Sequence, residues 1–244
     1  MRSFKNYIAL FALLALSSQL DAASTLITAV HSKSSISDET RNVSGFSGIS
    51  SVGSYNVFIT MGNTESLRIE GDPEQISEIQ TVVEDGTLKI RNKQRTGGWK
   101  NYNGKVNIYV NAKSLKSIVL SGSGDIKVSG TVKSPDVSTV LSGSGSISLT
   151  MDATNYSATI SGSGEIDAKG KAENAKIAVN GSGDFEGNDL RTSISSARMS
   201  GSGDICIQAD KALDAAMSGS GNIRYGGNAS VKSSKIGSGN ISKL

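Results

Sequence analysis

Apolar and polar residues alternate with a period of two through most of the chain after residue 117. The segment Asp125-Ile126-Lys127-Val128 shows this alternation in one line. A period of two is the pattern of a β-strand, whose side chains point in turn to a buried and to an exposed face. The pattern therefore predicts an all-β structure over this part of the chain.

A hexapeptide of the type Ser-Gly-Ser-Gly-Asp-Ile recurs between these alternating segments. Its seven copies begin at Ser121, Ser142, Ser161, Asn180, Ser200, Ser218 and Ile236. The second glycines of successive copies are 21, 19, 19, 20, 18 and 18 residues apart. A period of about 20 residues is typical of a solenoid, in which each repeat forms one coil.

A strand–turn–strand unit of this length cannot bury its own apolar face, so equivalent units are expected to stack ~4.8 Å apart. The repeats at 117–244 therefore predict a right-handed parallel β-helix with coils of about 18–21 residues. Glycines suit the tight corners of such coils. A β-sandwich is the alternative, since regular short strands also occur there. The near-identical columns favour the solenoid.

For residues 43–116, the N-terminal third, the sequence predicts a β-rich structure that belongs to the same domain as the repeats and contains one helix. Strands are expected at 66–71, 87–90 and 106–110. For the helix, Asp72 fits the N-cap, Pro73 the first position, and Gln75 completes a capping box. Its expected apolar stripe consists of Ile76, Ile79, Val82 and Val83. The segment Val52-Gly53-Ser54-Tyr55-Asn56-Val57 resembles a degenerate copy of the motif, as expected of a terminal repeat.

Residues 1–23 have the pattern of a secretory signal peptide. Arg2 and Lys5 precede a short apolar run, Ile8 to Leu16, and small residues follow near Ala22. No cysteine follows the run, and no later stretch is apolar enough to span a membrane. We therefore expect a flexible leader at 24–42 and an exported chain in the periplasm, at the cell surface or outside the cell.

Composition narrows the class of protein further. The 28 glycines argue against a helical bundle, and 36% hydrophobic residues with a net charge of +3 argue against disorder. That charge is too small to predict a nucleic-acid partner. With one cysteine, Cys206, and one histidine, His31, the chain has neither a disulfide framework nor a multi-histidine zinc site. Cys206 is expected to face outward, as a free thiol or as a small residue on a covered face.

The order of motifs from residue 43 to residue 241 resembles a known bacterial family. Gly45-Phe46-Ser47-Gly48-Ile49 leads into the degenerate repeat, Leu67 to Asp72 into the helix, and Lys105 to Val110 into the Ser-Gly-Ser-Gly arrays. This order is similar to that of the putative auto-transporter adhesin, head GIN domain family. The resemblance implies an exported β-helix-like protein of the cell envelope with no established reaction. Because the repeats run to Leu244, without the alternating strands of a membrane barrel, we expect no self-transport across an outer membrane.

A basic aromatic segment from Arg91 to Lys105 is the first candidate site. It contains the only tryptophan, and residues 88–116 hold eight basic and no acidic residues. Aromatic rings stack on sugar faces, and basic side chains hold acidic groups. The candidate ligand-binding residues are Arg95, Trp99, Lys100 and Tyr102. The alternative is a hairpin loop whose tryptophan covers the open end of the solenoid.

An acidic column at the repeat corners is the second candidate. Stacked carboxylates at Asp125, Glu165, Asp184 and Asp204 are a candidate Ca²⁺ site. The favoured interpretation is that Asp, Asn and Ser stabilise the turns through local hydrogen bonds. An enzyme of the pectate-lyase type would place its chemistry at Asp184, Asp204 and Arg198, but nothing distinguishes these residues from their columns. We expect no catalysis and no cofactor.

These observations predict an exported cell-envelope binding or adhesion module. Its β-solenoid surface would face a glycan or a cell-surface protein, because long regular faces recognise extended partners. The alternative is a structural envelope protein that self-associates as a homo-oligomer through an open β edge. Nucleic acid is not an expected partner.

Overall fold

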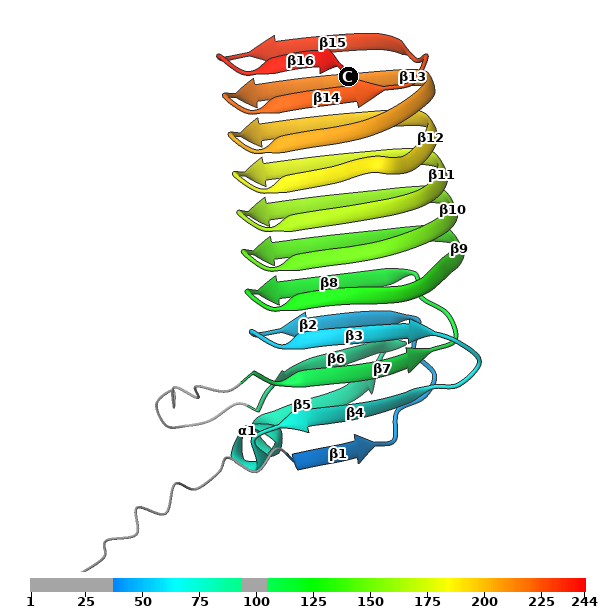
Figure 1. Ribbon diagram of the computed structural model, residues 1–244, viewed down its shortest axis with the longest axis vertical. Helices are drawn as coiled ribbons and strands as arrows, with labels where there is room; N and C mark the ends of the chain where they lie inside the picture. Colours follow the sequence, from blue (N-terminus) through cyan, green and yellow to red (C-terminus); the bar gives the residue numbers. More distant parts are fainter. Residues whose placement is uncertain (1–36, 94–104) are drawn as a thin grey trace, which may run out of the picture. The chain divides into compact units, whose positions relative to one another are not determined.

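The repeats wind into a parallel β-solenoid of about seven turns with coils of about 19 residues (Figure 1). The computed structural model describes residues 37–93 and 105–244, all within one compact unit. Strands β9 to β13 each form almost a whole coil. They span Asp125–Gly143, Ser146–Gly162, Glu165–Gly181, Asp184–Gly201 and Asp204–Gly219. Strands β14 (Asn222–Gly226), β15 (Ser230–Ile236) and β16 (Asn240–Lys243) follow.

Successive coils pair in parallel and keep one register except at local shifts in the β9–β10, β11–β12 and β12–β13 pairs. Ile126 pairs with Ile147, and Ile147 pairs with Ile166. The same column continues through Phe185, Ile205, Ile223 and Ile241. The predicted all-β solenoid is thereby confirmed, and the β-sandwich alternative is excluded, because a sandwich does not stack consecutive repeats in parallel register.

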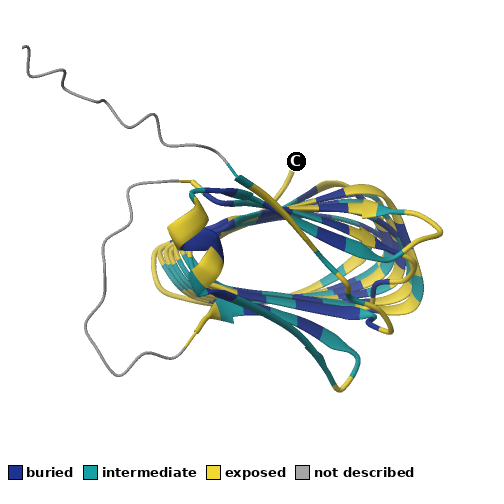
Figure 2. Ribbon diagram, turned by 90° about the horizontal axis from the view of Figure 1, so that it is seen from below, coloured by how far each residue is buried: buried dark blue, intermediate teal, exposed yellow. Residues whose placement is uncertain are grey.

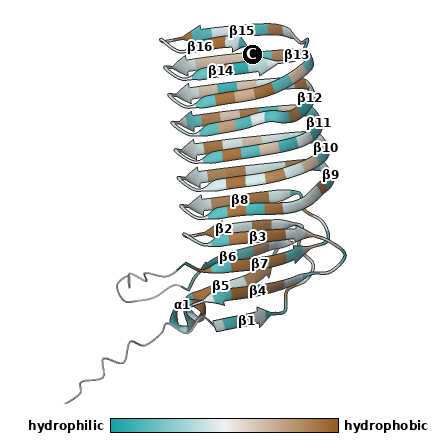
Figure 3. Ribbon diagram, viewed as in Figure 1, coloured by the Kyte–Doolittle hydropathy of each residue, from teal (hydrophilic) through white to brown (hydrophobic). Residues whose placement is uncertain are grey.

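Each coil contributes one strand segment to a first face and one to a second face. The first face holds the opening halves of β9 to β13, with β14 and β16 at one end. The second face holds the closing halves of the same strands, with β15. Seen along the solenoid in Figure 2, the two faces enclose a narrow interior with buried residues alternating along each strand. Hydrophobic residues alternate with hydrophilic ones in the same way (Figure 3).

The N-terminal strands extend both faces. They are β1 (Ser37–Arg41), β2 (Gly48–Val52), β3 (Asn56–Met61), β4 (Ser66–Gly71), β5 (Ile79–Glu84), β6 (Thr87–Asn92), β7 (Asn107–Ala112) and β8 (Ser117–Gly122). The first face continues from β9 through β3, β7 and β4 to β1. The second continues from β9 through β8, β2 and β6 to β5.

Chain order and stacking order differ in this N-terminal part. The coil made by β2 and β3 lies between the coil of β6 and β7 and the coil of β8 and β9. The degenerate Gly53-Ser54-Tyr55 corner therefore has a neighbouring coil on each side. Its prediction as a terminal repeat with one neighbour is wrong, because the chain runs out to β4, β5 and β6 and then returns.

The helix is shorter than its apolar stripe predicts. Helix α1 spans Pro73–Glu78, and the side chain of its N-cap, Asp72, accepts the backbone N–H of Glu74 at 2.8 Å, as expected. Val82 and Val83 lie in β5, which pairs antiparallel with β6. Their β-branched side chains favour a strand once a partner strand is present. The predicted turn at Asp85 and Gly86 joins β5 to β6, and both residues have positive φ.

The flexible leader predicted for 24–42 extends too far, because residues 37–41 form strand β1. This strand pairs antiparallel with β4. Its sequence, SDETR, has no apolar alternation, so backbone pairing and side-chain hydrogen bonds hold it instead.

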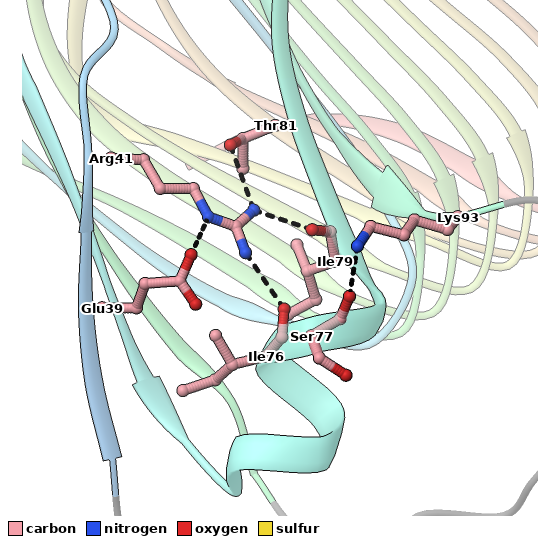
Figure 4. Close-up of polar contacts among 7 residues, drawn as sticks. All are labelled: Glu39, Arg41, Ile76, Ser77, Ile79, Thr81 and Lys93. Carbon is pink, nitrogen blue, oxygen red and sulfur yellow. Dashed lines mark hydrogen bonds and ion pairs between the residues drawn. The ribbon is translucent and has the colours of Figure 1, made fainter.

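Arg41 in β1 joins three elements at this end of the molecule (Figure 4). Its guanidinium donates hydrogen bonds to the carbonyl oxygens of Ile76 and Ile79, at 3.0 and 2.7 Å. It also donates to Thr81 Oγ1 at 3.1 Å and forms a salt bridge with Glu39 at 2.8 Å. Arg41 thereby adds side-chain hydrogen bonds to carbonyl groups at the C-terminal end of α1 and links β1 to α1 and β5.

Candidate functional site

The acidic corner residues stack as the repeat predicts, and one carboxylate oxygen each of Asp125, Asp184 and Asp204 accepts a hydrogen bond within the column. Ser146 Oγ donates to Asp125 at 2.7 Å, and the backbone N–H of Asp204 donates to Asp184 at 2.8 Å. Asn222 Nδ2 donates to Asp204 at 2.8 Å. These contacts are those of turn-stabilising side chains. Among the described residues, no group of three or more His, Cys, Asp or Glu side chains is arranged to hold a metal ion.

The three candidate catalytic residues, Arg198, Asp184 and Asp204, do not form one cluster, because they lie on different faces and have different partners. Arg198 lies on the second face and forms a salt bridge with Asp214 at 3.2 Å. Asp184 and Asp204 begin the first-face segments of β12 and β13. The Ca²⁺ alternative at the corner column stays a prediction, which titration calorimetry with Ca²⁺ tests.

Cys206 is buried, with an exposed fraction of 1%. It lies in register with Glu186 on one side and Arg224 on the other, and these long side chains flank it. Burial raises the pKa of the Cys206 thiol, and the charge of Glu186 raises it further. Of the two predictions, the structure favours a small residue on a covered face over a thiol that pairs between molecules.

The basic aromatic segment joins β6 to β7. Arg95, Trp99, Lys100 and Tyr102 lie outside the described residues, so their role as ligand-binding residues stays a prediction. Of its flanking bases, Lys89 forms a salt bridge with Glu84 at 2.6 Å, and Lys93 donates to the carbonyl oxygen of Ser77 at 2.5 Å. These two lysines stabilise the N-terminal end of the solenoid.

An aromatic stack on the outer side of the first face was not predicted. The rings of Phe58 and Tyr109 lie in register with centroids 5.3 Å apart and planes 21° apart. The guanidinium carbon of Arg68 lies 4.2 Å from the centre of the Tyr109 ring. Phe58 is 36% exposed, so the stack offers an apolar edge to a partner. The sequence alone indicates that both rings face outward, since each occupies a polar-face position in a strand of alternating apolar and polar residues.

A groove of about 640 Å³ crosses the coils where each strand bends into the second face. One rim is a column of exposed or half-buried polar side chains that begins with Asp136, Asn155 and Asn174. The other rim is a column that runs through Ser138, Ser157, Lys176 and Ser196. The floor, between the rims, includes Val137, Tyr156, Ala175 and Ser195. We call this feature the corner groove.

Two buried tyrosines make the free energy of unfolding depend on pH in the alkaline range. Burial raises the pKa of Tyr55 to about 12 and also raises the pKa of Tyr156, whose hydroxyl lies 2.8 Å from Thr139 Oγ1. An unfolded tyrosine ionises near pH 10, so above that pH the unfolded chain releases protons that the folded chain keeps. The free energy of unfolding should therefore stay level up to about pH 9 and fall between about pH 10 and 12. Denaturant unfolding of the wild type and of a Tyr55→Phe/Tyr156→Phe variant tests this, since the variant should lose less stability over that range.

Fold and surface together define an all-β parallel solenoid that presents a groove, an aromatic stack and polar corner columns. The chain belongs to the putative auto-transporter adhesin, head GIN domain family, whose model matches residues 45–229. This confirms the family that the motif order indicated. No curated protein matches the chain.

Several solved structures are similar to this chain. A putative adhesin from Bacteroides fragilis is 25% identical, with a TM-score of 0.80, over 86% of this chain and 97% of that one. A putative lipid binding protein from Parabacteroides distasonis is 27% identical, with a TM-score of 0.70, over 86% and 96%. A putative adhesin from the same organism is 21% identical, with a TM-score of 0.71, over 87% and 98%, and shows the fold alone. In the described part of the chain, no helix has the length and apolarity that a membrane crossing requires.

Proposed function

We propose that this protein is an exported, non-catalytic binding or adhesion module of the cell envelope, with a glycan or a cell-surface protein as its partner. The observation that carries the proposal is the corner groove, a recess that several stacked coils build from repeated polar side chains. In-register backbone pairing holds those side chains at fixed spacing, so binding costs little conformational entropy. Membership of an adhesin-like family supports the same role.

The basic aromatic segment is proposed as a second contact with the partner. Trp99 and Tyr102 would stack on apolar ring faces, while Arg95 and Lys100 would approach acidic groups. Trp99→Ala should weaken binding about tenfold without changing the melting temperature. The control for Trp99→Ala is Tyr225→Ala, which removes a half-buried aromatic side chain at the other end of the solenoid.

The experiment is a glycan array with the purified mature chain, combined with a mass measurement in solution. The proposal predicts a monomer that binds one class of glycan or, on intact bacterial and host cells, a surface protein. A stable oligomer that binds neither contradicts the proposal and favours a structural envelope protein.

A further inference from the structure

The last coil that the structure describes has a neighbouring coil on one side only. Its two strands are β15, which pairs with β13, and β16, which pairs with β14. Among the described strands, neither has a partner on its other side. Such an edge presents a row of backbone N–H and C=O groups with which a strand of another chain can pair. The residues at the inward positions of this coil decide whether a second copy can continue the stack.

On the second face, an apolar inward column ends at a lysine. The column consists of Leu120, Leu141, Ile160, Val179, Met199 and Met217, which are register partners from coil to coil. The register partner of the buried Met217 in β15 is Lys235. Register partners on neighbouring parallel strands point to the same side of the sheet. The next place in the apolar column is therefore taken by an ammonium group.

The first face ends in the same way. The buried Ile207 pairs with Tyr225, which packs half-buried against the core. The partner of Tyr225 in β16 is Lys243. Both Lys235 and Lys243 are exposed at this end, and residues 228–244 contain three lysines and no acidic residue. A further coil would bury both ammonium groups without a partner from this coil, which is strongly unfavourable.

Lys235 also makes a hydrogen bond that a further coil would otherwise make. In several inner coils, the carbonyl oxygen of the motif's second glycine accepts a backbone N–H from the following coil, as Gly221 does from Asn240 at 3.1 Å. Gly239 is the second glycine of the last copy. Its carbonyl oxygen accepts a hydrogen bond from Lys235 Nζ at 2.9 Å. The lysine side chain thus occupies the hydrogen-bonding position that the next coil needs.

The opposite end of the solenoid is closed by other means. Helix α1 lies at that end (Figure 1), and both its Ile76 and the following Ile79 are buried. Strand β1 at the same end is charged, with Asp38, Glu39 and Arg41 among its five residues. Stacking through open apolar columns is therefore possible only at the end formed by β15 and β16.

We propose that Lys235 and Lys243 cap the C-terminal coil and keep a second copy of this chain from stacking on it. The cap places one charge in an inward column of each face, and Lys235 also occupies the carbonyl group of Gly239. Inward-pointing charges are a known means of protecting an open sheet edge. This inference goes beyond the proposed function and depends on no ligand. It assigns the monomeric state of the chain to these two side chains.

Sedimentation velocity over a range of concentrations tests the cap with the variant Lys235→Met/Lys243→Ile. Methionine continues the column of Met217, and isoleucine continues the column of Ile207. We expect the wild type to stay monomeric and the variant to dimerise, with an association constant at least about tenfold higher. The dimer should form tail to tail and grow no further, because an isologous contact uses the open end of both copies.

Lys211→Met/Lys232→Ile is the matched control, because it makes the same changes at two other exposed lysines. Lys232 is the register partner of the exposed Asp214 and points outward. The control should stay monomeric. Adding Val231→Lys to the inward variant returns a charge to an inward position of the last coil, so this triple variant should be monomeric again. Circular dichroism and melting temperatures close to that of the wild type establish that each variant is folded.

Four results would overturn the cap. They are a wild type that dimerises as strongly as the inward variant, an inward variant that stays monomeric, a control that dimerises equally, and dimerisation that Val231→Lys does not reverse. The last result would indicate a frayed coil in place of an open apolar column. A wild-type dimer that still binds glycans or cells overturns the cap and leaves the proposed binding function standing. A capped monomer that binds neither does the reverse.

Discussion

Gly162→Ala is expected to lower the free energy of unfolding by about 3–5 kcal/mol. Gly162 ends β10 at the Ser-Gly-Ser-Gly corner with a φ of +125°, a conformation that residues with a Cβ rarely adopt. A Cβ there would also overlap the carbonyl oxygen of Gly143 in the preceding coil. The neighbouring coil is fixed by its own hydrogen bonds, so neither partner can move without breaking the stack. Denaturant unfolding followed by circular dichroism measures the loss.

Gly86→Ala is the matched control for this prediction. Gly86 lies in the turn between β5 and β6 with a φ of +70°, but nothing lies within 4 Å of where its Cβ would be. It therefore reports the backbone cost alone, about 1–2 kcal/mol. A Gly162→Ala loss no larger than the Gly86→Ala loss would show that the coils do not approach as closely as described.

Phe185→Ala is expected to cost about 3–5 kcal/mol, because it removes a fully buried ring from the interior column. Phe185 stands where other copies of the repeat have isoleucine, and its ring packs near Tyr156, with centroids 6.3 Å apart. The coil makes room for the larger ring at Gly187, where an added Cβ would collide with the Phe185 ring. The melting temperature and the free energy of unfolding should fall together.

Phe185→Leu serves as the control because it keeps most of the buried volume. It should cost less than about 1.5 kcal/mol. If Phe185→Ala proves as mild as Phe185→Leu, the residue does not lie in a close-packed interior. Thermal unfolding of both variants in the same buffer makes the comparison.

The repeat region could be predicted from the sequence because each coil repeats the same local signals. Alternation placed Ile126, Ile147 and Ile166 inside, and the recurrence of the motif at about 20 residues placed them one above another. Both signals lie within some 20 residues, so no knowledge of distant contacts was needed. Alternation did not predict burial at every position. Cys206 is covered by the side chains of neighbouring coils, and Ile194 is 49% exposed beside the buried Ser195.

The N-terminal part was less predictable because its structure depends on contacts between distant segments. Nothing local indicates that β2 inserts between β6 and β8, or that residues 37–41 pair with β4. Helix α1 has a good N-terminal signal in Asp72 and Pro73. Its end is set by the pairing of Ile79–Glu84 with β6, a tertiary effect that overrides the helical spacing of the apolar residues.

The candidate binding surfaces were partly visible in the sequence. The spacing of 19 residues from Asp136 to Asn155 and again to Asn174 could have indicated a ladder. That the ladder forms one rim of a groove depends on how the backbone bends into the second face, which no residue pattern reports. The aromatic stack likewise requires β3 and β7 to be neighbours, although they are separated in the chain by β4, α1, β5 and β6.

Disulfide cross-linking across the second face tests the in-register stacking of consecutive coils most directly. Thr159 and Ala178 are register partners in adjacent coils, whereas Thr159 and Arg198 are two coils apart. Adjacent parallel strands bring Cα atoms to ~4.8 Å, within the range of a disulfide, and two coils place them ~9.6 Å apart, beyond it. With Cys206→Ala as background, Thr159→Cys/Ala178→Cys should oxidise to an intramolecular disulfide, seen by mass spectrometry, and Thr159→Cys/Arg198→Cys should stay reduced. Equal oxidation of the two variants, or oxidation of the second alone, would contradict the stacked-coil architecture.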